Sequence, residues 1–373
     1  YEGRGIDTET ELAVQLGRTL DEEYERAYKE GEATSRAECQ TLQAAQFIST
    51  WMSEGGELGQ HPMAGVRRND QTGDVYGRVE LYTCIPREVT RDLFDDVYAS
   101  VLMSATLRPF DVTEDVLGLD SPATMAYGLA YPEANRRTYA AEVPALFASE
   151  RDDPETQETI SQLLGDVIRF TPGNTLLFFP SYSEAERYYG RLGGDAAAPE
   201  LGTLILDESG KSTEDLRQRF VASDDAVLFT SLWGTLAEGV SFDGNEARTV
   251  AVIGVPYPKL SERMEAVQDA YERAYKGKHQ NRDAGWAYAV EIPTIRKTRQ
   301  ALGRVIRSPE DFGVRILADK RYTNADMGKY SVRRSFPVEE REELVDISPE
   351  KLKFATLNFY TDHDAYDGTP PEP

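Results

Sequence analysis

The sequence contains few cysteines and histidines and no long apolar run. Cys39 and Cys84 are the only cysteines among 373 residues, too few for a disulfide framework or a four-cysteine cluster. The three histidines follow no metal-ligand spacing, so we predict no metal site. No stretch approaches the ~20 apolar residues of a membrane helix, and the first residues lack the pattern of a signal segment. These features predict a protein of the reducing cytoplasm without a membrane partner.

Lysine is also scarce, although the chain is strongly charged. Arginine supplies most of the 41 basic residues, and 65 acidic residues give a formal net charge of -24. One interpretation is an acidic protein that avoids nucleic acid. The other is a halophilic acidic protein, whose surface keeps it soluble in a salty cytoplasm. The acids are scattered along the chain, which favours the halophilic interpretation and leaves local arginine clusters to indicate ligands.

The start of the chain, up to about residue 54, is predicted to be mainly helical. The length allows two domains with sizeable cores, and because the chain starts with Tyr1 we expect it to be a piece of a longer protein. Residues 7–54 read as hydrophilic helices and residues 54–77 as a loop or hairpin. A strand is predicted at 79–84, a helix after Pro86, and a buried strand at the apolar run 100–103.

From about Tyr131, apolar strands alternate with amphipathic helices. Continuous Val, Ile, Leu and Phe runs are typical of a parallel sheet that is buried on both faces. The predicted fold class is therefore α/β, a parallel sheet covered by helices on both faces and preceded by a helical segment. The predicted strands are 175–179, 204–206, 226–229, 250–255 and 314–318.

The segment 300–307, Gln-Ala-Leu-Gly-Arg-Val-Ile-Arg, is predicted to lie on a helix that ends near the following proline. On such a helix Gln300, Arg304 and Arg307 share one face, and Gly303 marks close approach by a ligand or backbone. Two guanidiniums and an amide beside a gap suit an anionic ligand. We interpret the neighbouring basic residues as a solvated face: Arg296 and Lys297.

Two strand-to-loop junctions bring hydroxyl groups and aromatic rings to the carboxyl edge of the predicted sheet. Backbone N–H and hydroxyl groups at such an edge can bind phosphates. Trp233 either stacks on a base or sugar or packs under its own loop, and the sequence leaves both open. Glu238 and Gly239 follow Trp233 in the sequence. They either place the carboxylate of Glu238 close to a bound ligand or make Glu238 an ordinary exposed acid of the loop. The candidate contacts to a DNA strand are Ser181, Tyr182, Thr230, Ser231, Trp233 and Gly234.

Five motifs occur in order along the chain. They are Ser104-Ala105-Thr106, 177–182 (Leu-Phe-Phe-Pro-Ser-Tyr), 237–242 (Ala-Glu-Gly-Val-Ser-Phe), 254–258 (Gly-Val-Pro-Tyr-Pro), and 300–307 with Asp311-Phe312-Gly313. In this order and spacing they resemble motifs III to VI of the XPD/DinG family of superfamily 2 DNA helicases. The resemblance runs from about Val79 to Ala318 and implies RecA-like lobes. It divides the chain into the remnant of a helical arch insertion (1–60), the end of the first lobe (61–125), the second lobe (126–345) and a C-terminal tail (346–373).

Three elements of a full family member are absent from the sequence. They are the phosphate-binding loop with its lysine, the Asp-Glu-Ala-His box and the four cysteines of an iron–sulfur cluster. In the family they precede the Ser-Ala-Thr motif, so we expect them in a missing N-terminal motor half. The implied cofactors are ATP and Mg²⁺, bound mainly by that half, and an iron–sulfur cluster in the full-length protein only. Ser241 stands where the family commonly has an acid.

The resemblance implies a role for each motif. Arg304 and Arg307 would be arginine fingers for the γ-phosphate of ATP, with Gln300 sensing the nucleotide or positioning water. The nucleotide site would also include Glu238, Gly239 and Gly303. The residues that couple hydrolysis to lobe movement would be Ser104, Ala105 and Thr106.

The implied whole-protein activity is ATP-dependent 5′-to-3′ unwinding of single-stranded or forked DNA, of the DNA-repair type. The protein is expected to be monomeric, and this piece is expected to be inactive alone. One alternative is a non-enzymatic RecA-like module that binds single-stranded nucleic acid or partner proteins. A third hypothesis is a nucleotide-dependent RNA helicase.

Overall fold

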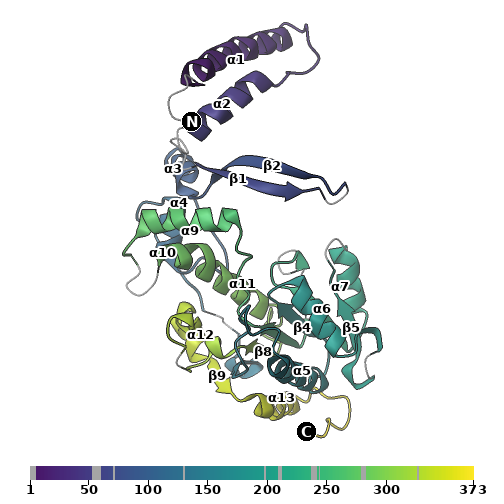
Figure 1. The fold of residues 1–373 in the computed structure, drawn as a ribbon. Helices are drawn as coiled ribbons and strands as arrows, with labels where there is room; N and C mark the ends of the chain where they lie inside the picture. The colour runs from purple at the N-terminus through teal and green to yellow at the C-terminus, as the bar shows by residue number, and fades with distance from the viewer. Residues whose placement is uncertain are drawn as a thin grey trace. The chain divides into compact units, whose positions relative to one another are not determined.

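The structure, a computed structural model, describes residues 6–52, 60–69, 72–128, 131–196, 199–208, 212–236, 242, 244–278, 283–325 and 327–373. The chain divides into two compact units (Figure 1). The first comprises Tyr1–Val101, Asp111–Pro122 and Leu260–Lys278, and the second comprises Leu102–Phe110, Ala123–Lys259 and His279–Pro373. This division does not follow the predicted boundaries at 60, 125 and 345.

The first unit contains a pair of helices and a β-hairpin. Helices α1 (Ile6–Lys29) and α2 (Gln40–Met52) approach closely at Gly17, where an added Cβ would lie 2.7 Å from the Cα of Leu42. Strands β1 (Gln60–Arg68) and β2 (Val75–Thr83) pair antiparallel. The predicted helices in 7–54 and the predicted strand near 79–84 are thus present in the described residues.

Three more helices complete this unit: α3 (Arg87–Asp95), α4 (Phe110–Leu117) and α9 (Glu262–Tyr275). Helix α9 was expected in the second lobe, but Arg263 on α9 makes two hydrogen bonds, of 2.6 and 2.7 Å, to the Glu80 carboxylate on β2. The Tyr275 hydroxyl donates to the carbonyl of Asp115 over 2.6 Å. These bonds join α9 to segments that precede it by more than a hundred residues.

The strand predicted at 100–103 is wrong. Within the described range 72–128, residues 99–104 form no regular element, and Val101 and Met103 are 80% and 87% exposed. A strand requires a neighbour for its backbone N–H and C=O groups, and this segment pairs with none of the described strands.

The second unit is built on a seven-stranded sheet in the order β5-β6-β4-β7-β8-β3-β9. Every neighbouring pair is parallel, as predicted for continuous apolar strands. The strands are β3 (Arg136–Ala141), β4 (Thr175–Phe179), β5 (Thr203–Leu206), β6 (Ala226–Ser231), β7 (Thr249–Ile253), β8 (Gly313–Ala318) and β9 (Leu344–Ile347).

Helices cover both faces of this sheet, which confirms the predicted fold class. Successive side chains of a strand point to opposite faces, so Phe178 lies in one apolar cluster and Phe179 in the other. Helices α7 (Thr213–Val221) and α11 (Ile292–Leu302) contribute to the cluster of Phe178. Helices α5 (Pro154–Arg169), α6 (Tyr182–Arg191) and α13 (Pro349–Asp362) contribute to the cluster of Phe179.

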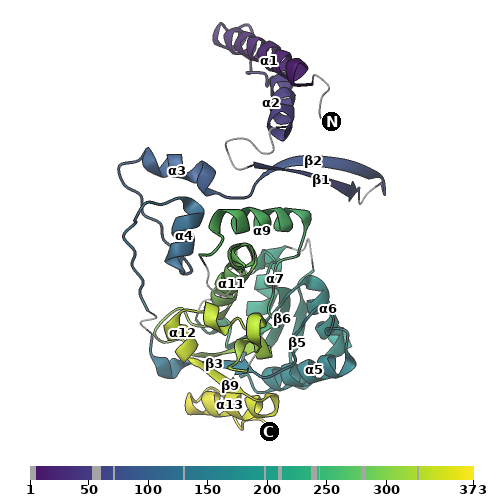
Figure 2. The same ribbon diagram turned by 60° about the vertical axis from the view of Figure 1, so that its left-hand side comes forward.

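The region after residue 346 folds with the sheet. Strand β9 pairs with β3, and Leu352, Phe359 and Tyr360 of α13 are buried in the cluster of Phe179. Figure 2 shows α13 beside α5. Residues 346–373, predicted as a tail, thus include a core helix.

Short elements connect the main ones. They are α10 (Ala284–Trp286), a π-helix (Ala287–Glu291), α12 (Val338–Glu342), and 3₁₀ turns at Glu133–Asn135, Gly194–Ala196, Pro199–Leu201, Gly244–Glu246, Lys320–Tyr322, Gly328–Tyr330 and Arg333–Ser335. Among the helices in the described residues, none is both long and apolar enough to cross a membrane.

Candidate functional site

Two of the predicted motifs meet at Gln300 and Thr106. Gln300 lies in the last turn of α11, and its Nε2 donates a hydrogen bond of 3.1 Å to Oγ1 of Thr106. Thr106 is 6% exposed, and its backbone N–H donates to Oγ of Ser104 over 3.2 Å. Ser104 and Ala105 are themselves exposed. The predicted nucleotide-sensing and coupling residues are therefore in direct contact across 194 positions of sequence.

Arg296 holds the segment that follows Thr106. Its guanidinium donates to the carbonyls of Leu107, Arg108 and Pro109 at 2.7, 3.3 and 3.3 Å. A guanidinium group has hydrogen-bond donors and no acceptors, and that of Arg296 satisfies three backbone carbonyl groups. The prediction that Arg296 lies on a solvated basic face is therefore wrong.

The arginine-bearing segment does not continue the helix as predicted. Helix α11 ends at Leu302, and the N–H of Arg304 donates to the carbonyl of Ala301 over 3.0 Å in a tightened last turn. The chain then turns and buries Val305 and Ile306 with Leu302 in the cluster of Phe178. The predicted shared helical face of Gln300, Arg304 and Arg307 is therefore wrong.

The turn nevertheless holds both arginines in defined places. Arg304 is 7% exposed, and Arg307 is half-buried. The carbonyl of Arg307 accepts from the Tyr131 hydroxyl over 2.6 Å, and its N–H donates to the Asp311 carboxylate over 2.8 Å. Asp311 also accepts from the N–H of Ser308 over 2.8 Å. Two side chains from outside the segment thus fix its backbone.

Gly303 borders open space. It is exposed, and an added Cβ would meet only the carbonyl oxygens of Arg299 and Gln300, both at 3.5 Å. No close approach by another backbone occurs here among the described residues, so the space beside this glycine is open to a ligand. Glu238, Gly239 and Ser241 lie outside the described residues.

The two strand-to-loop junctions come together as predicted. Strands β4 and β6 are parallel neighbours, with Phe179 opposite Ser231, so the chain leaves both strands at one edge of the sheet. Gly234 packs against Tyr182, because an added Cβ would lie 3.0 Å from Cζ of that ring. Burial, followed by the charge of Asp207, raises the pKa of Tyr182 and keeps its phenol neutral.

Several of the residues that were predicted to contact DNA form hydrogen bonds within the protein, at the ends of β4 and β6 and in the loops that follow. Thr230 is fully buried and donates to the Asp207 carboxylate over 2.7 Å. Ser231 is 2% exposed, and its Oγ accepts from the N–H of Trp233 over 3.3 Å. Oγ of Ser181 caps α6 by accepting from the N–H of Glu184 over 3.2 Å. Asp207 was missed in the sequence, although it directly follows β5 at the same edge.

Trp233 is half-buried and fixed on two sides. Its Nε1 donates to the carbonyl of Pro256 over 2.8 Å. The ammonium group of Lys297 lies 4.8 Å from the centroid of its ring, a cation–π contact. The interpretation of Lys297 as part of a solvated face is therefore wrong. The ring packs on its own loop, as one of the two alternatives predicts, and keeps part of its surface exposed. Stacking on a base or sugar stays a prediction.

The family comparison points to helicases. Residues 164–336 match a family model described as helicase C-terminal domain. This range includes the Ser181 and Trp233 junctions and the segment from Gln300 to Arg307.

Curated relatives agree with this match. The XPD helicase subunit of general transcription and DNA repair factor IIH from Schizosaccharomyces pombe is 26% identical over 266 residues, which cover 66% of this chain and 33% of that protein. The corresponding XPD/RAD3 subunit of Saccharomyces cerevisiae is 24% identical over 258 residues, covering 65% and 32%. The ATP-dependent DNA helicase DDX11 of Danio rerio is 26% identical over 190 residues, covering 46% and 21%. The chain thus spans about a third of the length of the two XPD relatives.

Solved structures show the same fold. A structure named XPD helicase matches with a TM-score of 0.57 and 20% identity, over 87% of this chain and 53% of that chain. A second, named XPD apo, matches with a TM-score of 0.55 and 20% identity, over 72% and 52%. The sheet is therefore RecA-like, and residues 164–336 form a helicase C-terminal domain similar to that of XPD helicases.

Proposed function

We propose that this chain supplies the second motor lobe of an ATP-dependent DNA helicase that moves 5′ to 3′ along one strand, with a role of the DNA-repair type. The observation that carries the proposal is the hydrogen bond between Gln300 and Thr106. It connects the motif expected to sense nucleotide with the motif expected to transmit movement. Such a contact gives a motor a direct route from the nucleotide to the rest of the chain.

In this proposal Arg304 and Arg307 act as arginine fingers on the γ-phosphate, and Gln300 senses the nucleotide or positions water. The open space beside Gly303 would admit the phosphate, and Glu238 and Gly239 would complete the site. Tyr131 and Asp311 fix the backbone of the turn at Arg307, and in this proposal the fixed backbone limits the rearrangement that is needed when charge develops in the transition state. Arginine fingers contribute roughly 10³ to 10⁵ in rate.

The strand site of this proposal lies at the common edge of β4 and β6. Ser181, Tyr182 and Trp233 keep exposed surface there and would contact sugar, phosphate and base. The buried Thr230 and Ser231, with Gly234, would hold the loop in shape. Contacts to the sugar–phosphate backbone and stacking carry little sequence preference, which suits a motor that passes every sequence.

The remaining chemistry would come from an N-terminal motor half. That half would supply the phosphate-binding loop, the Mg²⁺ ligands and the iron–sulfur cysteines, so this chain alone would not hydrolyse ATP. When bound, ATP with Mg²⁺ supplies the phosphoryl group whose transfer drives movement. Within this chain, Arg304, Arg307 and Gln300 would bind and orient the nucleotide. The residues at the edge of β4 and β6 would bind and orient the DNA strand. We propose a monomeric helicase, with single-stranded or forked DNA as its partner.

The test uses the whole helicase and measures DNA-stimulated ATP hydrolysis. Arg304→Ala and Arg307→Ala should each reduce the rate by roughly 10³ or more, whereas Arg219→Ala, an exposed arginine on α7, should leave it unchanged. Normal hydrolysis by either finger variant would contradict the assignment. Nucleotide-independent DNA binding without any hydrolysis would instead favour the non-enzymatic binding module.

A further inference from the structure

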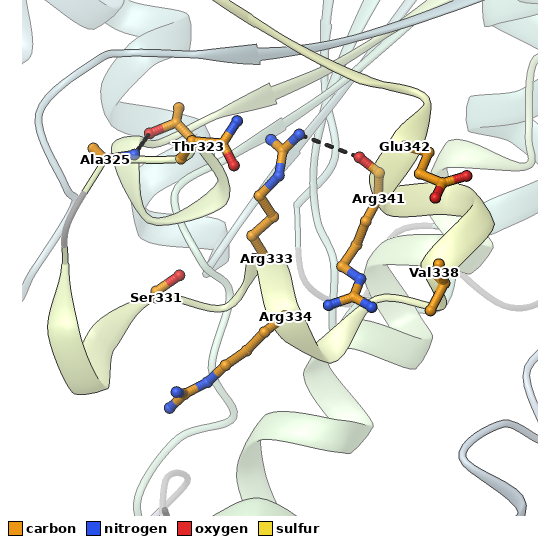
Figure 3. Close-up of a pocket in the computed structure, with 9 residues that line it drawn as sticks. Thr323, Ala325, Ser331, Arg333, Arg334, Val338, Arg341 and Glu342 are labelled. Carbon is orange, nitrogen blue, oxygen red and sulfur yellow. Dashed lines mark hydrogen bonds between the residues drawn. The ribbon is translucent and has the colours of Figure 1, made fainter.

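The connection between β8 and β9 borders an open pocket of about 460 Å³. It is lined by parts of three short segments, 323–325, 331–334 and 338–342 (Figure 3). Its size falls in the range of small-molecule sites, roughly 300–1,000 Å³. Strand β9 is at the opposite edge of the sheet from β5, so this pocket is separate from the candidate strand site at β4 and β6.

Arg333 forms the rigid framework of the pocket. Its Nη1 donates to the Tyr322 carbonyl and the Asp346 carboxylate at 3.1 and 2.7 Å. Its Nη2 donates to the carbonyls of Arg341 and Leu344 at 3.2 and 2.8 Å, and Figure 3 shows the bond to Arg341. One side chain thus ties together four positions around the pocket, which is therefore formed before any ligand binds.

Two other arginines give the pocket its charge. Arg334 is exposed and Arg341 half-buried, and neither forms an ion pair with any residue that the structure describes. The nearby acidic residues form ion pairs with arginines other than Arg334 and Arg341. The pairs are Glu339 with Arg108, Glu340 with Arg299, Glu343 with Arg136 and Arg315, and Asp346 with Arg333. In a chain of net charge -24, this local excess of positive charge is unusual.

One acid remains at the pocket. Glu342 also lines it, but in Figure 3 its carboxylate is directed away from the guanidiniums of Arg334 and Arg341. Its charge lowers the positive potential of the site without neutralising either arginine by contact.

We propose that this pocket binds the phosphoryl group of a small phosphorylated ligand. Arginine matches phosphate oxygens in a bidentate geometry and stays charged at any physiological pH. The volume is larger than a phosphate ion needs, so the ligand carries a further polar group of about the size of a sugar. This site is independent of the proposed helicase activity and of the arginines at 304 and 307.

The experiment is isothermal titration of the chain with ribose 5-phosphate, inorganic phosphate and ribose at low ionic strength, where screening is weak. Ribose 5-phosphate should bind more tightly than inorganic phosphate, and uncharged ribose should not bind. Arg334→Gln and Arg341→Gln should each weaken ribose 5-phosphate roughly tenfold or more, because a hydrogen bond to a charged group is lost.

Two matched variants serve as controls. Glu342→Gln should strengthen binding because it removes a negative charge that repels the phosphoryl group. Arg219→Gln, which changes an exposed arginine on α7, should leave binding unchanged. Thermal unfolding of each variant confirms that it is folded. The proposal is overturned if neither phosphate compound binds, if ribose binds as well as ribose 5-phosphate, or if both arginine variants bind like the Arg219 control.

Discussion

Nε2 of Gln300 lies 3.1 Å from Oγ1 of Thr106 and donates a hydrogen bond to it. The two residues belong to motifs that lie 194 positions apart in the sequence, and both motifs lie in the second compact unit. Arg296, one turn earlier on the same helix, holds the three residues after Thr106 by their carbonyls. Helix α11 therefore positions residues 106–109 through the side chains of Arg296 and Gln300, which lie one turn apart.

The first prediction concerns the bond between these residues. In the whole helicase, Thr106→Val should reduce DNA unwinding more than ATP hydrolysis, because the substitution removes the acceptor of Gln300 without touching the arginines. The folded chain should lose only about 1 kcal/mol, the usual net value of one hydrogen bond. Unwinding and hydrolysis are measured on the same preparation.

A matched control is Thr159→Val, which changes a threonine on α5 whose hydroxyl donates to the carbonyl of Glu155 in the same helix. It should leave both rates unchanged. Equal loss of unwinding and hydrolysis in Thr106→Val would show that the contact supports catalysis itself, and the coupling role would be abandoned.

The second prediction concerns Trp233. Trp233→Ala should weaken single-stranded DNA binding by about 1–3 kcal/mol, the usual contribution of one stacked base. Trp233→Phe keeps a ring but loses the bond from Nε1 to the Pro256 carbonyl, so it should retain most of the affinity. Fluorescence anisotropy with a labelled oligonucleotide measures both. If the two variants bind equally weakly, the loop bond and not stacking is what matters.

The sheet was predictable because its strands are continuous apolar runs, which locally favour a strand and globally favour burial on both faces. The end of α11 was not, because Val305 and Ile306 fit helical spacing as well as they fit the turn that buries them. The interactions of Arg296 depend on a segment 187–189 residues earlier, and local sequence contains no signal for them. Residues 100–103 have the composition of a strand, but composition does not specify a pairing partner.

The third prediction tests a buried ion pair near the end of β8. Arg321 and Asp319 have side chains that are 2% and 0% exposed, and they are joined by hydrogen bonds of 2.9 and 2.7 Å. Asp319→Ala should destabilise the chain by roughly 3–5 kcal/mol, because the guanidinium stays buried without its counter-charge. The double variant Asp319→Ala/Arg321→Met should lose less than the sum of the two single variants. Urea unfolding at neutral pH measures all four proteins, and strict additivity would contradict the coupling.

The last prediction concerns Glu184 on α6, which is 2% exposed and whose Oε2 has no hydrogen-bond partner in the described structure. Burial raises the pKa of this carboxyl, and the charges of Arg187 and Arg151, at 3.7 and 4.0 Å, only partly oppose the increase. Because the folded-state pKa is raised, the folded state binds the proton more tightly than the unfolded state does. The stabilisation from Glu184 is fully present below its usual pKa of 4.5 and is lost as pH rises through the raised value.

Glu184→Gln removes this titration and should therefore stabilise the chain relative to the wild type at pH 7, with a smaller difference below the usual glutamate pKa. The matched control is Glu186→Gln, which makes the same substitution at an exposed glutamate on the same helix. The difference in unfolding free energy between each variant and the wild type is measured by urea unfolding at both pH values. A difference for Glu184→Gln that grows as the pH falls would mean that the carboxylate is favoured in the folded state, with the two arginines outweighing the cost of its burial.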